Sequence, residues 1–265
     1  MEQEAIRESP NADHQEGGGM VEEHGNRPGV LIITRNNLAL TKKTVASVMA
    51  QDIPFDLVVI DNQSTDGTIQ WALTKAWTFV HLSHQKSLAH CWNLGLKTLW
   101  TSGHETVLVL NNDVEIRPDT LRLLLAHGGE FVTCVSVDSK ERLGVAGDRD
   151  IEELKKTQRE HPDYSCWLIR KSVTDKGIWF NEDCYPAYCE DSFHHVACVR
   201  AGIRPVCVDV PFFHYAAGTL KCAGPGEAER IKRGAQSNRE MFRAKYGCYP
   251  GTPEYEALFS EGPSQ

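Results

Sequence analysis

The chain has 265 residues, of which 41% are hydrophobic, 24% charged and 8% aromatic, the composition of an ordinary globular protein. This length fits one large domain or two small ones. No apolar run approaches the ~20 residues that a membrane-spanning helix needs, and no basic start followed by an apolar stretch marks a secretory signal. The nine cysteines are an odd number without a C-x-x-C pair, which argues against a disulfide scaffold and a zinc knuckle. We therefore expect a cytoplasmic protein.

The formal net charge of −8 is concentrated near the N-terminus, where residues 1–29 hold seven acids against two arginines. An acidic chain repels nucleic-acid phosphates, which argues against broad binding to DNA or RNA. The stretch from Lys221 to Lys245 is a local exception, with seven basic residues against three glutamates. It is either a solvated helix face or a surface for an anionic partner. Residues 1–28 are polar and rich in glycine, and we predict a disordered acidic tail.

Four short apolar runs follow the tail, and a stretch with helical spacing comes after each of them. The predicted strands are 30–34, 57–61, 79–82 and 106–111, and the predicted helices are 38–49, 68–77, 88–100 and 119–126. Strands that are apolar throughout and alternate with helices are typical of a parallel sheet covered on both faces. The pattern predicts an α/β fold.

The pattern is less regular after residue 130. Strands are predicted at 131–137, 166–170 and 206–208, helices at 190–201 and 227–246, and a polar stretch at 140–163. No flexible linker separates the two parts, so we expect one domain over 29–250 rather than two. Its divisions are 29–130, 131–226 and a C-terminal helix at 227–250, followed by a tail at 251–265.

Polar residues follow three of the predicted strands. They are Thr34 to Asn37, Asp61 to Thr68, and Asn111 to Asp113. Ligands of open parallel sheets bind outside the carboxyl ends of the strands. Each group also has a structural interpretation, because Asn caps helices, Asp66-Gly67 makes a turn, and Ser64 or Thr65 can cap the next helix. A carboxylate with two amides, as at the third strand end, suits a hard divalent cation. Together the three groups predict a nucleotide pocket.

Several nucleotide-binding and hydrolytic classes are excluded by missing motifs. The chain has no G-x-G-x-x-G after the first strand, no G-x-x-x-x-G-K-[ST], and no G-x-S-x-G. A dinucleotide dehydrogenase, a P-loop kinase or ATPase, and a hydrolase with a nucleophile elbow are therefore not expected.

Six segments, in order, resemble the family 2 glycosyltransferases of the GT-A fold, especially the rhamnosyltransferase-like branch of bacteria and phages. They are VLIITRNNLALTKKTVASVMAQ, VVIDNQSTDGT, SLAHCWNLGLKTL, VLVLNNDVEI, the segment from Trp167 to Val208, and Phe213 to Thr219. The resemblance covers about residues 29–246. It implies a single nucleotide-binding, Rossmann-like domain with a mostly parallel central sheet, in which 29–130 is the nucleotide-sugar half and 131–226 the acceptor half.

The resemblance implies an inverting glycosyltransferase, in which an acceptor hydroxyl attacks the anomeric carbon of a nucleoside diphosphate sugar. Asp191 matches the base that takes the hydroxyl proton, and Glu190 would orient it or contact the acceptor. The two acids also suit the N-terminus of the helix predicted there. The residues that would bind the donor are Thr34, Asn36, Asp61, Asn62, Asn93, Asn111 and Asn112, with UDP, dTDP or GDP as the nucleotide.

The resemblance also implies a divalent ion, Mn²⁺ or Mg²⁺, that neutralises the leaving diphosphate. Asp113 is the expected ligand, helped by Asn112 or Asn111, and His214 is a further contact unless it is a packed ring. The sequence departs from the family in having one acid in its metal motif, and Asn62 where several relatives have a second Asp. Asp148 to Asp150 have no counterpart in the family, and His194 and His195 are expected to pack.

Two other functions compete with glycosyl transfer. A nucleotidyltransferase would need a glycine-rich, basic loop after the first strand, and Thr34 to Asn37 is not such a loop. A catalytically weak protein that only binds sugar nucleotide or glycan would lack the base, whereas Asp191 is present. The acceptor stays open among a glycan, a lipid-linked sugar and, last in order, a modified DNA base.

Overall fold

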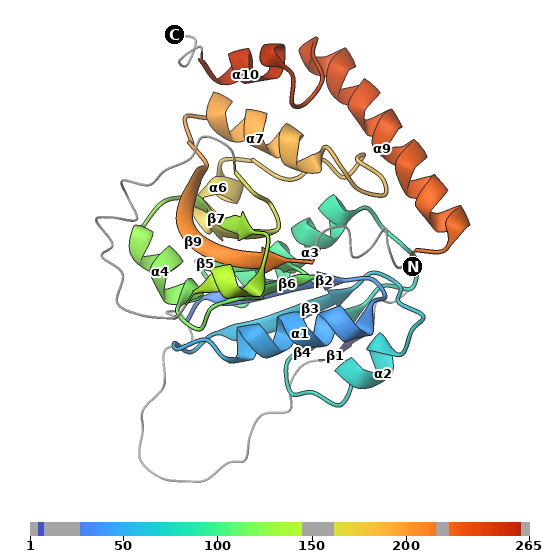
Figure 1. The fold of residues 1–265 in the computed structure, drawn as a ribbon, viewed down its shortest axis with the longest axis vertical. Helices are drawn as coiled ribbons and strands as arrows, with labels where there is room; N and C mark the ends of the chain where they lie inside the picture. Colours follow the sequence, from blue (N-terminus) through green and yellow to red (C-terminus); the bar gives the residue numbers. More distant parts are fainter. Residues whose placement is uncertain (1–4, 8–26, 145–161, 216–222, 261–265) are drawn as a thin grey trace.

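The computed structural model describes residues 5–7, 27–144, 162–215 and 223–260 (Figure 1). Their strands form one curled, nine-stranded sheet in the order β1-β4-β3-β2-β5-β8-β7-β9-β6, with helices packed on both faces. The α/β class predicted from the sequence is confirmed. None of the described helices is both long enough and apolar enough to cross a membrane.

The first half of the sheet is parallel. It contains β2 (Gly29–Thr34), β3 (Asp56–Asp61), β4 (Thr78–His81) and β5 (Thr106–Asn111). The register pairs Thr34 with Asp61, Asp61 with His81, and Ile33 with Asn111. The carboxyl ends of these strands therefore lie in a row along one edge of the sheet.

The second half is mixed. It contains β6 (Val114–Ile116), β7 (Phe131–Val137), β8 (Cys166–Arg170) and β9 (Val206–His214). β8 is antiparallel to β5 and β7, β9 is parallel to β7, and β6 is antiparallel to β9. The last pairing sets Val114 opposite His214, so the loop after β5 meets the end of β9. At the other edge, β1 (Ala5–Arg7) pairs antiparallel with β4.

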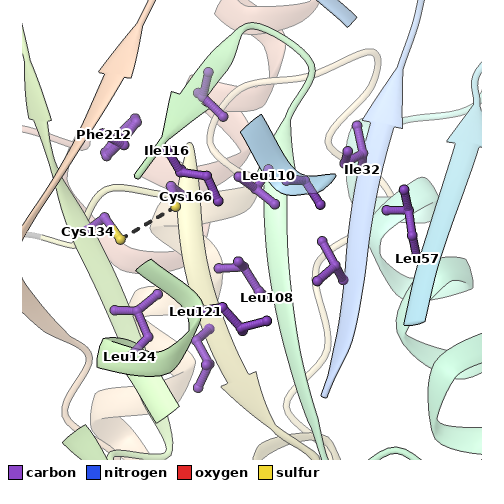
Figure 2. Close-up of a cluster of buried hydrophobic side chains, with 14 of the residues drawn as sticks. Ile32, Leu57, Leu108, Leu110, Ile116, Leu121, Leu124, Cys134, Cys166 and Phe212 are labelled. Carbon is purple, nitrogen blue, oxygen red and sulfur yellow. Dashed lines mark hydrogen bonds between the residues drawn. The ribbon is translucent and has the colours of Figure 1, made fainter. Parts of the chain in front are cut away.

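Two hydrophobic clusters cover the two faces of the sheet because alternate residues of each strand point to opposite faces. Val30 and Ile32 of β2 pack toward α1 (Leu38–Met49) and α4 (Thr120–His127). Figure 2 shows part of this cluster, including Cys134 and Cys166, whose sulfurs lie 3.5 Å apart. Leu31 and Ile33 pack on the other face toward α3 (Leu88–Thr101).

A third cluster joins three C-terminal helices. Phe193 and Val196 of α7 (Glu190–Arg200) pack with Phe242 of α9 (Pro225–Tyr246) and Tyr255 of α10 (Pro253–Ser260). Figure 1 shows these helices gathered at the end of the molecule opposite α1 and α2 (Thr68–Ala72). This layer covers the start of α7, where the two predicted catalytic acids lie.

Several elements differ from the sequence prediction. α2 ends at Ala72 rather than residue 77, and β9 runs to His214 rather than ending at residue 208. β9 is hard to recognise in the sequence because Asp209 and Pro211 both disfavour strands. In the structure, the pairing of β7 with β9 shifts register between Thr133 and Val135, and Pro211 pairs with Val135 just after the shift. Five described elements were not predicted at all: β1, β6, α10, α6 (Lys171–Asp175) and the 3₁₀ helix η2 (Lys140–Leu143). β1 lies within the segment predicted to be disordered.

Candidate active site

The loops after β2 and β3 are joined by their own side chains. The Asn36 backbone N–H donates to Ser64 Oγ at 2.6 Å, and Asn36 Oδ1 accepts from the Thr65 N–H at 2.8 Å. Asn36 and Asn37 both have positive φ, at 55° and 61°, a conformation that asparagine tolerates better than most residues. The two strand ends therefore form one rigid edge.

Asp66, rather than the predicted residues, caps the two neighbouring helices. Its Oδ2 accepts from the Leu38 N–H of α1 at 2.8 Å, and its Oδ1 accepts from the Thr68 N–H of α2 at 3.2 Å. The interpretation of Ser64 or Thr65 as the cap of α2 is wrong, because both are bonded to Asn36. Asn37 occupies the N-cap of α1 without a side-chain cap bond.

Arg35 connects this edge to the C-terminal helix. One guanidinium nitrogen donates to the backbone oxygens of Asn62 and Gln63, at 2.9 Å each. Another lies 2.8 Å from Glu227 Oε1 on α9. The sequence did not identify this role, because Arg35 has no local partner and all three acceptors lie far along the chain.

Asp61 is fully buried at the end of β3. Its Oδ2 accepts from the Ser64 N–H at 3.0 Å and lies 2.8 Å from His81 Nδ1. Its Oδ1 is buried and has no hydrogen-bond partner among the described residues. An unsatisfied buried carboxylate oxygen is costly unless a ligand supplies a donor. Of the predicted donor-binding residues, Asp61 retains the clearest free acceptor.

Two other predicted donor-binding residues hold neighbouring backbone. The Asn62 carboxamide clamps Lys86, donating to its C=O at 3.0 Å and accepting from its N–H at 2.8 Å. Asn93 lies within α3 and clamps Phe180 in the same way, at 2.9 and 3.1 Å, while also donating to Glu182. Their polar groups are engaged within the protein, so both would act by positioning loops.

Asn112 links the loop after β5 to the loop after β2. Its amide nitrogen donates to Thr34 Oγ1 at 3.2 Å, Thr41 Oγ1 at 3.1 Å and the Asn36 C=O at 3.2 Å. Thr34 in turn shares a hydrogen bond with Thr41 at 2.9 Å. The half-buried Asn111 side chain makes no such bond with the described residues, and its backbone N–H donates to the Ser165 C=O at 3.0 Å. The structure brings the three predicted strand ends together.

The predicted metal ligands are in direct contact. Asp113 Oδ1 lies 3.2 Å from His214 Nε2, and the Tyr215 N–H donates to the Asp113 C=O at 2.9 Å. Burial acts to lower the pKa of His214, but its hydrogen bond and charge interaction with Asp113 outweigh burial and raise it. No group of three or more His, Cys, Asp or Glu side chains able to hold a metal occurs in the described part of the chain.

The predicted catalytic acids begin α7. Glu190 is 4% exposed, and its Oε2 has no hydrogen-bond partner among the residues that the structure describes. Burial and the charge of Asp191 raise the pKa of Glu190 well above its ordinary value. Burial also raises the pKa of Asp191, against hydrogen bonds from Ser192, whose N–H lies 2.7 Å from Asp191 Oδ1. The N-cap of α7 makes no side-chain cap bond, and Glu190 Oε2 is left without a partner among the described residues.

The metal pair and the acid pair influence common neighbours. The charge of Asp163 contributes to raising the pKa of both His214 and Asp191. Burial, Glu190 and Asp113 together raise the pKa of Tyr188. Both pairs therefore lie within electrostatic range of the same two residues, Asp163 and Tyr188. Asp163 could not be identified from the sequence, because it lies in a polar stretch without a motif.

The remaining predictions have mixed outcomes. The prediction that His194 and His195 pack is confirmed, since their rings stack on Phe180 and Phe259 with centroids 4.1 Å apart in each case. Much of the basic stretch is α9, where Arg230, Arg233 and Arg243 pair with glutamates of the same helix. Lys221, the loop at Gly218 and Thr219, and Asp148 to Asp150 lie outside the described residues.

The fold is that of a GT-A glycosyltransferase. The sequence profile described as Glycosyl transferase family 2 matches residues 29–178, and the chain belongs to this family. It is therefore a glycosyltransferase. No curated protein sequence matches the chain.

Solved structures of similar fold have low sequence identity to this chain. A mannosyltransferase from Pyrobaculum calidifontis, in complex with GDP-Man and Mn²⁺, has a TM-score of 0.58 and 21% identity, covering 89% of this chain and 69% of its own. The structure of S. aureus TarS residues 1–349 in complex with UDP has a TM-score of 0.55 and 17% identity, covering 83% of this chain and 74% of its own. Glucosyl-3-phosphoglycerate synthase from Mycobacterium tuberculosis, in a complex that includes Mn²⁺ and UDP, has a TM-score of 0.56 and 14% identity, covering 90% of this chain and 88% of its own.

Proposed function

We propose that the protein transfers a sugar, with inversion, from a nucleoside diphosphate sugar to an acceptor hydroxyl. The observation that carries this proposal is the acid pair at the start of α7, where Glu190 is buried with an oxygen unpaired among the described residues and Asp191 is half-buried. Glu190 and Asp113 both lie within electrostatic range of Tyr188. Asp191 is the base. Its raised pKa brings it closer to the operating pH, which strengthens a general base that is still ionised. Burial and the charge of Asp191 raise the pKa of Glu190 well above its ordinary value, and its unpaired Oε2 is proposed to contact the acceptor.

The donor base is proposed to meet Asp61. An ionised carboxylate only accepts hydrogen bonds, so its free Oδ1 suits a base with a ring N–H. Uracil, thymine and guanine have one, whereas cytosine and adenine would have to donate from an exocyclic amine. The ring N–H is the donor we propose, which gives UDP, dTDP or GDP as the nucleotide. The Asn36, Asn62 and Asn112 carboxamides hold the loops around it, and Thr34 and Asn93 stabilise the same framework.

The donor diphosphate is proposed to lie against Asp113 and His214, with Asn111 beside them. A carboxylate and an imidazole fit Mn²⁺ or Mg²⁺, which commonly bind through few protein ligands plus substrate phosphates. The bound ion would neutralise charge on the departing diphosphate. Because Asp113 and His214 share a hydrogen bond, His214 must give up its proton before its Nε2 can be a ligand.

Titration calorimetry with nucleoside diphosphates tests this function. We expect UDP, dTDP or GDP to bind more tightly with Mn²⁺ than without it, and CDP and ADP to serve as mismatched controls. Asp113→Asn should abolish the increase in affinity caused by Mn²⁺. Asp61→Asn should weaken binding of the preferred nucleotide and leave the affinity for the mismatched nucleotides unchanged. If no nucleotide binds, or if Mn²⁺ has no effect on any of them, the proposed donor site is wrong.

The acceptor is proposed to be a glycan or a lipid-linked sugar, with a modified DNA base as the remaining alternative. A nucleotidyltransferase is not favoured, because Arg35, the basic residue of the loop after β2, is bound to two carbonyls and Glu227. Release of labelled sugar from the bound donor in the presence of wild-type protein would separate a working transferase from a protein that only binds sugar nucleotide.

A further inference from the structure

Two exposed tyrosines lie in the loop that leads to the catalytic acids, and they differ in their contacts. Tyr185 is 42% exposed, yet its hydroxyl accepts from Arg230 at 2.7 Å, and the same guanidinium lies 5.8 Å from its ring centroid. Tyr188 is 45% exposed, and its side chain makes no hydrogen bond, aromatic contact or cation–π contact with the described residues. Arg230 therefore accounts for the position of Tyr185, while no such contact accounts for Tyr188.

The backbone holds Tyr188 in place at a cost in free energy. Tyr188 and Cys189 have φ values of 76° and 71°, in the left-handed region that non-glycine residues rarely occupy. Such strain persists where the surroundings enforce it, and it is common at functional sites. The structure therefore keeps the Tyr188 ring at the surface instead of letting the loop relax.

Helix α9 enforces this conformation. Asn238 is 3% exposed, and its amide nitrogen donates to the Ala187 C=O at 2.9 Å and the Tyr188 C=O at 3.0 Å. One helical turn earlier, a Cβ on Gly234 would lie 2.6 Å from the Tyr185 oxygen, so only glycine allows α9 to approach so closely. The ring of Tyr188 is thus positioned by buried contacts at its backbone while the ring itself stays open.

The surroundings of Tyr188 are acidic. The charges of Glu190 and Asp113 both reach its side chain, one from the acid pair and the other from the predicted metal pair. Asp163 acts on the same two pairs. Apart from the diphosphate, whose charge a bound cation would neutralise, such a group of acids repels anions but accepts hydrogen bonds from hydroxyl groups.

We propose that Tyr188 is an acceptor-binding residue whose ring stacks on the face of a neutral pyranose, which presents a hydroxyl to Asp191. An aromatic face carries partial negative charge, and the face of a pyranose presents C–H groups with partial positive charge. The acids around the ring favour this neutral sugar over a nucleic acid, whose phosphates they repel. This inference rests on the proposed function and names the acceptor class for it.

Saturation-transfer NMR tests the proposal with protein loaded with Mg²⁺ and whichever of UDP, dTDP or GDP binds. The probes are methyl glycopyranosides of neutral hexoses and deoxyhexoses, the matching methyl uronates, and the dinucleotide dTpT. We expect at least one neutral pyranoside to bind, with saturation strongest at its ring C–H protons. The uronates and dTpT should bind more weakly.

Substitutions at the two tyrosines separate stacking from loop structure. Tyr188→Phe keeps the ring and should leave pyranoside affinity nearly unchanged, whereas Tyr188→Leu and Tyr188→Ala should weaken it roughly tenfold or more, the size of a lost stacking contact. Tyr185→Phe, in the same loop, should bind as the wild type does. Because the Tyr188 ring is exposed, the thermal unfolding midpoint should stay unchanged in the three Tyr188 variants.

The inference is overturned if Tyr188→Ala binds the pyranoside as well as wild type, or if a uronate or dTpT binds better than every neutral pyranoside. It is also overturned if the nucleotide binds but no pyranoside does, and in that case the proposed function survives. If no nucleotide binds to the wild type, the donor site fails first, and pyranoside binding to the unloaded protein still decides whether Tyr188 stacks on sugars.

Discussion

The donor-side loops and the loop before α7 are stabilised in opposite ways. The donor-side loops satisfy one another, through Asn36 with Ser64, Asn62 with Lys86, and Asn112 with Thr34. They leave one conspicuous acceptor, the Oδ1 of Asp61, without a partner among the described residues. A site of this kind is rigid before its ligand arrives, because few groups must reorganise on binding.

The loop before α7 is held from outside. Its strained residues Tyr188 and Cys189 depend on Asn238 of α9, and it presents both an unpaired Glu190 oxygen and an open tyrosine ring. On the proposed function, donor recognition would be built into the sheet edge, whereas acceptor recognition would depend on the C-terminal helices. Changes in α9 near Asn238, away from the Arg35–Glu227 contact, would then alter acceptor binding while leaving the donor site intact.

The largest expected effect comes from removing the proposed base. Asp191→Asn should lower turnover by roughly 10²-fold or more, because the acceptor hydroxyl loses its proton acceptor. Donor binding should be unchanged, since the donor-side loops do not depend on Asp191. Because burial raises the pKa of Asp191, wild-type activity should fall as pH drops through that raised value and the base becomes protonated. Turnover of labelled donor across a pH series measures both effects.

Asp183→Asn is the matched control, because Asp183 is exposed in the loop preceding the acids. Its turnover and pH profile should equal those of the wild type. Near-normal turnover in Asp191→Asn would mean that the base lies elsewhere. The loop before α7 would then have no established part in catalysis.

The rigidity of the donor half is tested at Gly95. A Cβ there would lie 2.3 Å from Leu31 Cδ1 in the packed layer between α3 and β2. Gly95→Ala should lower the free energy of unfolding by about 1–3 kcal/mol through overpacking, partly offset by better helix propensity. Urea denaturation measures it. Gly226→Ala in α9, where a Cβ meets nothing within 4 Å, should be neutral or stabilising, and equal loss in both variants would contradict the packing argument.

The fold was predictable where the pattern is local. Strands such as β2 and β5 are continuous apolar runs, and the predicted order of strand and helix through the first half is confirmed. β9 was predicted too short because Pro211 interrupts its pattern, and α10 was missed because its docking on α7 depends on Tyr255, far from α7 in sequence. Tertiary packing decides such elements, and a single sequence does not display it.

The site was predictable only in part, for a related reason. The three polar strand ends and the acids of α7 stand out in the sequence because motifs mark them. Arg35, Asp163 and Asn238 do not, since each acts through partners distant in the chain. The sequence also could not tell that the amides of Asn62 and Asn93 are engaged by backbone groups.

The layer beneath the acids should respond to pH through His194. Burial lowers the pKa of His194 to about 3 from 6.5, and its Nδ1 lies 3.1 Å from the Tyr164 hydroxyl. The folded state keeps His194 neutral while the unfolded state binds a proton below pH 6.5, so its contribution to stability is full above pH 6.5 and is lost as pH falls toward 3. His194→Gln should remove up to about 1.4 kcal/mol per pH unit from that slope.

Unfolding free energies measured in urea at several pH values between 4 and 7.5 would show this difference. His84→Gln, at an exposed position, is the control and should keep the wild-type slope. If the pH dependence of the unfolding free energy is unchanged in His194→Gln, His194 gains no proton on unfolding. The packing around His194 in α7 would then be looser than the structure indicates.

The smallest expected effect is at the contact that joins the two regions. Arg35 meets Glu227 of α9 at 2.8 Å while also holding the backbone after β3, so this ion pair connects the donor-side loops to the helix that positions Tyr188. Both side chains are about one-fifth exposed, and Glu227→Gln should cost about 0.5–1 kcal/mol of stability. Donor affinity should fall only slightly, because Arg35 keeps the two backbone carbonyl oxygens to which it donates. Glu229→Gln is the control, since the ion pair of Glu229 among the described residues is with Arg233 of its own helix, at 3.9 Å. Equal effects of the two substitutions on donor affinity would show that the regions are independent, and acceptor-side changes in α9 would then leave the donor site wholly unaffected.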